Sequence, residues 1–512
     1  MKTKFLTVLF VLGLFICMLD TTIMNVSLPT ISNALHVGLD DMSWALNVYL
    51  ILFAALTIPL TRLAEVYGIQ KGFLLGVILF GVGSIVSAAA PALNILLIGR
   101  AIQSIGAAII FPLAMTLAIG LVNDDHRTGM IGILGITQGI AGALGPTIGG
   151  IVTQFFGWRW IFLINVSLVI IMLVLGMTYL TLKHEVQHKQ RLDVWGAILS
   201  IIFLSSLSIG LIQGRVWGWH AWLTITCFGL SSMSFILFLI VEQRSVNPMV
   251  PLQLFKNRVF SISAIIIILS NLFLVATTVI LPTYFTSIAG FDALHASLLV
   301  APISLAIFIF SPISGFAQAI IQPKWLLTLG FLIMTCGYLW LANGALVNQT
   351  QTILSGTMVG MGYGLIAGPI LVIAAGSLHG KLLTASQSVT SVLRQVGAML
   401  AVAIFITSLY GNLALSKKQS QSYAESSINK LAIPSEQKTT MIGKIAHKSH
   451  DDHFIQTDTT ALPREISDSI KDIEIHTTVL LWSSFEKLYA ISVPFLLMCA
   501  VLSLFLKEKQ PL

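Results

Sequence analysis

Apolar stretches of about 20 residues, the length needed to cross the hydrocarbon core of a bilayer, recur along almost the whole chain. No water is available at that depth to satisfy open backbone groups, so such stretches fold as helices. Only 10% of the residues are charged, against roughly 25% in a soluble domain. We therefore predict an all-α integral membrane protein with fourteen spans, at about 5–28, 45–64, 72–91, 94–119, 130–153, 158–180, 194–213, 221–241, 259–282, 293–316, 324–343, 351–376, 389–410 and 485–506.

Most basic residues lie on alternate connections between these spans and at the two ends of the chain. Short cytoplasmic loops are enriched in Lys and Arg, which predicts cytoplasmic termini and an extracytoplasmic loop at 411–480. This topology, with attraction to anionic lipid, accounts for the net charge of +7 without nucleic acid. Arg159 and Arg215 are exceptions to the alternation. The basic positions that follow it are Lys2, Lys4, Arg62, Lys71, Arg127, the segment 183–193, Arg244, Lys256, Arg258, Lys324, Lys381, Lys507 and Lys509.

The sequence does not favour chemistry at a metal ion or a nucleophile. The four cysteines stand alone within apolar spans, which argues against a disulfide framework or a metal site. The run HKSHDDH at 447–453 has metal-ligand residue types, but a solvated loop is the better interpretation of it. A membrane-embedded enzyme would need a nucleophile–base pair or a metal cluster at membrane depth. We predict no enzyme activity, no metal and no cofactor.

Ionisable residues inside the predicted spans are scarce. A charge at the bilayer centre costs about 2.5–3.5 kcal/mol on insertion scales, so it is retained where it faces a partner or a cavity. Asp20 is the one carboxylate that we place deep in the membrane. Arg100 and Gln103 lie one turn apart on one helix face, and Arg394 lies in a later span. We expect Asp20 and Arg100 to face the bundle interior.

The stretch QGIAGALGPTIGG at 138–150 holds five glycines and a proline in thirteen residues. Small residues let helix backbones approach closely, and a proline bends a helix where neighbouring groups can satisfy its carbonyl. Close packing is one interpretation. We also predict a pliable helix surface against which another helix rocks, formed by Gly142, Gly145, Pro146, Gly149 and Gly150.

Several of these stretches resemble one family. LDTTIMNVSLP at 19–29 resembles the first-helix signature of the fourteen-span drug/proton antiporters of the major facilitator superfamily, the EmrB/QacA type, with Ser27 where the family usually has Ala. RAIQSIGAA at 100–108 resembles their fourth-helix motif. AGALGPTIGG at 141–150 resembles the antiporter motif, which is associated with exporters rather than uptake carriers. Two further stretches, 158–166 and 247–260, are also similar to family segments.

The resemblance implies two six-helix bundles plus two additional transmembrane helices. The N-terminal bundle is expected at 1–183, the extra pair at 194–241, and the C-terminal bundle at 242–410 and 485–506. The family also has a gating motif after the second span. Here it reads TRLAEVYGIQK, with Glu65 in place of the usual Asp and with Lys71 as the remaining member of the basic pair. These departures weaken the inference that the motif forms a charge clamp.

The resemblance implies a proton-coupled antiporter of the cytoplasmic membrane that exports lipophilic, often cationic, compounds by alternating access. Burial favours the neutral form of a carboxyl group, which lets it take up and release a proton. Asp20 with Arg100 would then couple protons to transport, although an ion pair that only fixes helix register is the simpler alternative. The residues expected at the substrate cavity are Asn25, Gln103, Gln138, Tyr284, Phe285 and Arg394.

Other functions remain open. A lipid or an endogenous metabolite suits such a bundle almost as well as a drug, and a proton-coupled uptake permease would share the buried acid. The expected partners are small-molecule substrates, protons and the lipid bilayer. A membrane-fusion partner protein is known for some relatives, and the sequence does not decide whether one exists here.

Overall fold

The computed structural model describes residues 2–182, 192–291, 293–318, 320–376, 378–429 and 464–506. Within these ranges the secondary structure is helical and contains no strand. Thirteen helices are long and apolar enough to cross a membrane. Helix α6 (Asp124–Phe156) is bent by 45° between Gly142 and Thr147 and makes a fourteenth. The predicted all-α membrane fold is confirmed, and the sequence of the bent stretch includes a proline, Pro146, a residue type that commonly kinks helices.

The other helices follow the predicted spans and extend beyond most of them. The first bundle contains α1 (Lys2–Leu35), α3 (Trp44–Tyr67), α4 (Ile69–Ala88), α5 (Leu93–Ile119), α6 and α7 (Trp160–Tyr179), and is followed by α8 (Val194–Trp217) and α9 (Trp222–Arg244). The second contains α11 (Arg258–Ser287), α12 (Ala293–Ala317), α13 (Pro323–Ala342), α14 (Gln349–Ala375), α15 (Gly380–Ala401), α16 (Thr407–Asn429) and α18 (Arg464–Leu504). Short elements are α2 (Leu39–Met42), α10 (Gln253–Lys256), η2 (Ala345–Val347) and the π-helical turn η3 (Val402–Ile406).

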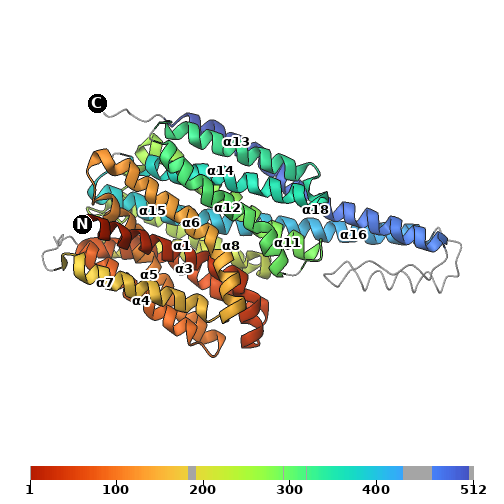
Figure 1. Cartoon of the computed structure of the whole chain (residues 1–512), viewed down its shortest axis with the longest axis horizontal. Helices are drawn as coiled ribbons and strands as arrows, with labels where there is room; N and C mark the ends of the chain where they lie inside the picture. The colour runs from red at the N-terminus through yellow and green to blue at the C-terminus, as the bar shows by residue number, and fades with distance from the viewer. Residues whose placement is uncertain are drawn as a thin grey trace.

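Packing separates these helices into two groups that meet along one seam (Figure 1). In the first group α1 packs on α5, α6 and α7, and α4 packs on α5. In the second group α14 packs on α12 and α13, and α18 packs on α13. The groups meet where α6 lies against α12 and α14, and where α3 lies against α15. Helix α8 pairs with α9 and also contacts α3, α15 and η3, so the extra pair reaches both sides of the seam.

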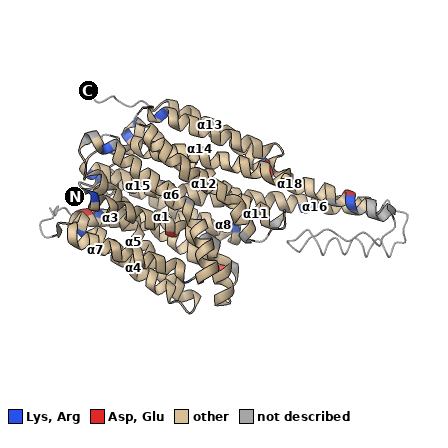
Figure 2. Cartoon of the chain, in the orientation of Figure 1, with Lys and Arg blue, Asp and Glu red and all other residues tan. Residues whose placement is uncertain are grey.

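Both ends of the described chain, the start of α1 and the end of α18, lie at one end of the molecule, as an even number of spans requires (Figure 1). Most of the Lys and Arg residues drawn in Figure 2 gather at this same end. The described parts of 411–480 project from the opposite end. By the positive-inside rule the end with the termini is predicted to face the cytoplasm.

The two described parts of the segment 411–480, predicted as an extracytoplasmic loop, are helical. Residues 411–429 continue α16 and residues 464–480 begin α18, and the two helices pack on each other as an arm beyond the bundle. Polar contacts join them. Ser416 Oγ lies 2.8 Å from Ser484 Oγ, and the Tyr423 hydroxyl donates to Asp472 at 2.6 Å. Hydropathy shows where a helix leaves lipid, not where it ends. The run 447–453 and residues 183–191 lie outside the described residues.

The predicted topology is tested with single cysteines at Lys418 and Lys256, which are both exposed, on the arm and on α10. In intact cells an impermeant maleimide should label Lys418→Cys and leave Lys256→Cys unlabelled. In inside-out vesicles the pattern should reverse. Labelling of Lys256→Cys from outside intact cells would invert the orientation. A background without the four native cysteines serves as the control.

Candidate functional site

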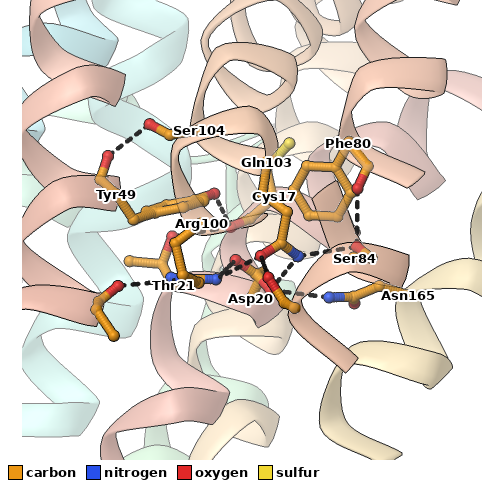
Figure 3. Close-up of polar contacts among 12 residues, drawn as sticks. Cys17, Asp20, Thr21, Tyr49, Phe80, Ser84, Arg100, Gln103, Ser104 and Asn165 are labelled. Atoms are coloured by element: carbon orange, nitrogen blue, oxygen red, sulfur yellow. Dashed lines mark hydrogen bonds and ion pairs between the residues drawn. The ribbon is translucent and has the colours of Figure 1, made fainter. Parts of the chain in front are cut away.

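Asp20, in α1, is completely buried, and both of its carboxylate oxygens accept hydrogen bonds (Figure 3). Oδ2 accepts from Arg100 Nη1 at 2.6 Å. Oδ1 accepts from Asn165 Nδ2 at 2.8 Å and from Gln103 Nε2 at 3.3 Å. These donors lie on α5 and α7, so the structure brings Asp20 together with Arg100 and Gln103 as a cluster within the first bundle.

Arg100 is held by groups other than Asp20. Its Nε donates to the Ala45 carbonyl at 3.1 Å, and its guanidinium carbon lies 4.3 Å from the centre of the Tyr49 ring. A guanidinium has five N–H donors, and its Nη2 has no acceptor among the described residues. Arg100 is therefore anchored on α3 whether or not Asp20 is charged.

Gln103 extends the cluster to α4. Its Nε2 also donates to Ser84 Oγ at 2.8 Å, and its Oε1 accepts from Ser87 Oγ at 3.3 Å and from Arg100 Nη1 at 3.1 Å. Both ends of the amide are thus occupied inside the first bundle. Gln103 belongs with the Asp20–Arg100 pair and not with a cavity between the bundles.

Sequence reasoning missed Asn165, Ser84 and Tyr49 as members of this cluster. A weak signal existed for two of them. Asn165 is the one amide in the apolar run of α7, and Ser84 and Ser87 lie about one turn apart on α4. Such residues also occur as ordinary helix-packing groups in membranes, so the signal alone does not assign them to a site.

Gln138 and Arg394, both expected at the cavity, do meet. Arg394 Nη1 on α15 donates to Gln138 Oε1 on α6, so the contact joins the two bundles. Both side chains are buried, and Gln138 also reaches Met115 Sδ at 3.7 Å. Arg394 forms no ion pair with any residue that the structure describes. An arginine without an acidic partner therefore stands at the seam.

Tyr284 and Phe285 lie elsewhere than expected. The Tyr284 hydroxyl donates to the Leu346 carbonyl in η2, and its ring packs edge-on against Phe485 of α18 at 5.4 Å. An aromatic residue near a span end commonly anchors its hydroxyl on the backbone in this way. These contacts give a packing role within the second bundle and do not support a cavity wall. The side chain of Asn25 lies outside what the structure describes.

The glycines of the antiporter-like motif pack α6 against α1, in the same bundle. A Cβ on Gly145 would overlap Thr22 Oγ1 and lie 2.7 Å from Thr22 Cβ, and one on Gly149 would overlap the Ile23 carbonyl oxygen. Gly142 has more room, with Met18 Cε at 3.9 Å, and Gly150 is half-buried. The contacts of Gly145 and Gly149 begin two residues after Asp20. The predicted close approach is present, and the helix approached is the one that carries Asp20.

Another part of α6 faces the second bundle. A Cβ on Gly135 would lie 2.7 Å from Gly368 Cα on α14, and one on Gly139 would lie 2.9 Å from Ser311 Cβ on α12. A Cβ on Gly315 would meet Ile136 at 2.7 Å. The contact between the two bundles therefore uses Gly135 and Gly139, which precede the predicted motif in α6.

The end with the termini is closed by contacts between the bundles. Glu65 on α3 forms an ion pair with Arg62 and lines one pocket with Thr384 of α15, with which it interacts. At the start of α6, Arg127 donates to the Leu378 carbonyl, which precedes α15. Lys71 is exposed on the first turn of α4. Glu65 thus lies where the two bundles meet.

Comparison with known proteins agrees with this architecture. The sequence profile of the Major Facilitator Superfamily matches residues 10–402. Multidrug resistance protein 3 of Bacillus subtilis is 29% identical over 415 residues, 79% of each chain. The methylenomycin A resistance protein of Streptomyces coelicolor is 30% identical over 402 residues, 76% of this chain and 82% of that protein. The probable multidrug resistance protein EmrY of Escherichia coli is 32% identical over 336 residues, 65% of each chain.

A solved structure supports the fold. That of the proton:xylose symporter XylE aligns with a TM-score of 0.55 at 11% identity, over 99% of this chain and 96% of that one. At this identity the likeness shows the fold alone. Together with the family match and the fourteen apolar spans, it gives one conclusion: the chain belongs to the Major Facilitator Superfamily and is a multi-pass membrane transporter, not an enzyme.

Proposed function

We propose that this transporter exports lipophilic compounds from the cytoplasm in exchange for protons. Export is supported by relatives that are named for resistance to drugs and to methylenomycin A. Proton exchange is supported by one observation above the others, the fully buried pair of Asp20 and Arg100 inside the first bundle. Intramembrane ion pairs of this kind mark proton and ion pathways in transporters.

The proton step follows from the hydrogen bonds at Asp20. Each described contact to its carboxylate comes from an N–H donor. A proton on the carboxyl group removes the negative charge that holds Arg100, so loading weakens the pair and lets it separate. Arg100 keeps its contacts with α3, and the motion is therefore taken up by α1. Release of the proton re-forms the pair.

Motion of α1 reaches the seam through α6. Thr22 and Ile23, which follow Asp20 closely, pack on Gly145 and Gly149 of α6. The preceding turns of α6 contact α12 and α14. Protonation of Asp20 is thus connected by packed helices to the surface along which the bundles rock. Opening toward the cytoplasm would break the contacts of Glu65 with Thr384 and of Arg127 with Leu378.

The charges at the seam bear on the class of substrate. Arg394 is positive and contacts the neutral Gln138, whereas the charge of Asp20 is already paired with Arg100. A cation that binds near Gln138 would meet an uncompensated positive charge. We therefore propose neutral and anionic lipophilic compounds as substrates, ahead of the cations that the family resemblance implies.

Transport into inside-out vesicles tests both parts of the proposal. With an acidic lumen, the wild type should accumulate substrate, whereas an uptake permease would expel it. Anionic, neutral and cationic compounds of matched hydrophobicity are compared with Arg394→Gln. This variant should lower anion transport by about tenfold or more, since a hydrogen bond to a charged group contributes roughly 1.5–3 kcal/mol, and change neutral transport less than about twofold. Preferential loss of cation transport would contradict the assignment.

A further inference from the structure

Two carboxylates lie on either side of one glycine where α8 begins and α9 ends, away from Asp20. Asp193 caps α8, and its Oδ1 accepts from the Gly196 backbone N–H at 2.8 Å. Glu242, in the last turn of α9, is 4% exposed. A Cβ on Gly196 would lie 3.0 Å from Asp193 Oδ2 and 3.2 Å from Glu242 Oε1. Both carboxylates therefore lie against the same glycine, whose missing side chain leaves room for them.

Each of these carboxylates has a buried oxygen without a donor. Asp193 Oδ2 and Glu242 Oε2 accept no hydrogen bond from any residue that the structure describes. Burying an unpaired charge costs several kcal/mol, and a second negative charge beside it adds repulsion. One proton taken up by the two groups removes the repulsion and leaves a single negative charge, as in carboxylate pairs that share a proton.

The charged groups of the surrounding helices do not replace such a proton. Arg62 of α3 interacts with Glu242 but is already paired with Glu65. Arg244, two residues after Glu242, is exposed, as is Lys256 of α10. Lys381 of α15 interacts with Glu65 on the far side of the seam. Among the described residues no cation forms an ion pair with either carboxylate; the segment 183–191, which includes Arg191, lies outside them.

Glu242 also holds the linker that joins the extra helices to the second bundle. Its Oε1 accepts a hydrogen bond from the backbone N–H group of Met249, at 3.0 Å, and Val250 is the next residue of the linker. The side chains of these two residues are buried. They line one pocket with Thr61 and Glu65 of α3 and with Thr384 of α15. Glu242 thus holds the linker residues Met249 and Val250 between the bundles, at the end of the molecule where α1 begins and α18 ends.

We propose that Asp193 and Glu242 form a second proton-binding site, separate from Asp20, whose occupancy controls the seal between α3 and α15. With one proton bound, Glu242 stays buried and holds Met249 and Val250 in the seam. With both groups ionised, their repulsion expels Glu242 toward water and releases the linker. The extra helix pair then acts as a pH-dependent latch, which keeps α3 and α15 in contact while the proton is bound. This role goes beyond the proton exchange proposed for Asp20.

Infrared spectroscopy of purified protein in micelles tests the proton site. Titration should show a protonated carboxyl band that Glu242→Gln removes. Asp193→Asn, which keeps the helix cap, should shift the midpoint of this band to lower pH because the neighbouring negative charge is gone. The same band, with an unchanged midpoint, in both variants would overturn the proposal. Asp20→Asn serves as the control and should leave this band in place. The experiment therefore distinguishes a failure of this proposal from a failure of the coupling role proposed for Asp20.

Thiol labelling tests the latch. Ser388 lines the same pocket and is 3% exposed, whereas Val246 in the linker is 93% exposed. Single cysteines at these positions are labelled with maleimide across pH, and the Val246→Cys rate corrects for thiol ionisation. The corrected rate at Ser388→Cys should rise at least several-fold as pH increases, and this rise should vanish when Glu242→Gln is added. A rise of equal size with Glu242→Gln would show that the latch does not exist.

Discussion

Replacing Asp20 by Asn should abolish proton-driven efflux of every substrate, with at least a hundredfold loss of the transport rate. The amide cannot ionise, so the step in which Arg100 releases and recaptures a carboxylate no longer occurs. The same change leaves Arg100 buried without a counter-ion. Breaking a buried pair in this way costs about 3–5 kcal/mol, and a lower melting temperature of the purified variant is therefore also expected.

A double variant separates the two effects. Asp20→Asn with Arg100→Gln removes both charges and strands neither. If the pair serves only to fix helix register, stability and transport should return together. Proton coupling predicts that the melting temperature recovers while efflux remains absent. Recovery of efflux in the double variant would assign the pair a structural role.

Replacing Gly149 by Ala should remove folded protein from the membrane or stop transport almost completely. The added methyl would overlap the Ile23 carbonyl oxygen and lie 3.0 Å from Ile23 Cγ1. A backbone oxygen cannot rotate away, so α6 and α1 must separate, and overpacking of this kind costs about 1–3 kcal/mol or more. The yield and melting temperature of purified protein give the stability, and vesicle transport gives the activity.

Gly142→Ala is the matched control on the same helix. Its added methyl finds its nearest neighbour, Met18 Cε, at 3.9 Å, which is an ordinary contact. This variant should keep wild-type stability and at least half of the transport rate. Equal loss in Gly142→Ala and Gly149→Ala would mean that helix flexibility, rather than close approach to α1, is what the glycines supply.

The membrane fold was predictable because span length and backbone satisfaction in lipid leave few alternatives. The Asp20–Arg100 contact was predictable for a related reason. Two opposite charges in apolar spans of one bundle lose the least free energy when they meet. Gln138 and Arg394 could be predicted as candidate site residues because polar groups are scarce in these spans. The structure joins them across the seam.

Other features depend on how helices cross, which one sequence does not reveal. Thr22 and Ile23 face Gly145 and Gly149 because α1 and α6 run side by side. The helical arm was predicted as a loop because its residues are polar, although Ser416 and Ser484 use that polarity to pair two helices. Glu242 ends an apolar span, a position that hydropathy assigns to the membrane surface. It is buried because the linker folds back over it.

Proton release from purified protein on addition of a transported compound tests the central claim most directly. The measurement uses wild type, Asp20→Asn with Arg100→Gln, and Glu242→Gln in weakly buffered micelles, with a pH dye as the readout. The account predicts release by the wild type and by Glu242→Gln, and no release by the Asp20 double variant although it is folded and binds the compound. Wild-type release by that double variant would contradict the assignment of Asp20 as the proton carrier.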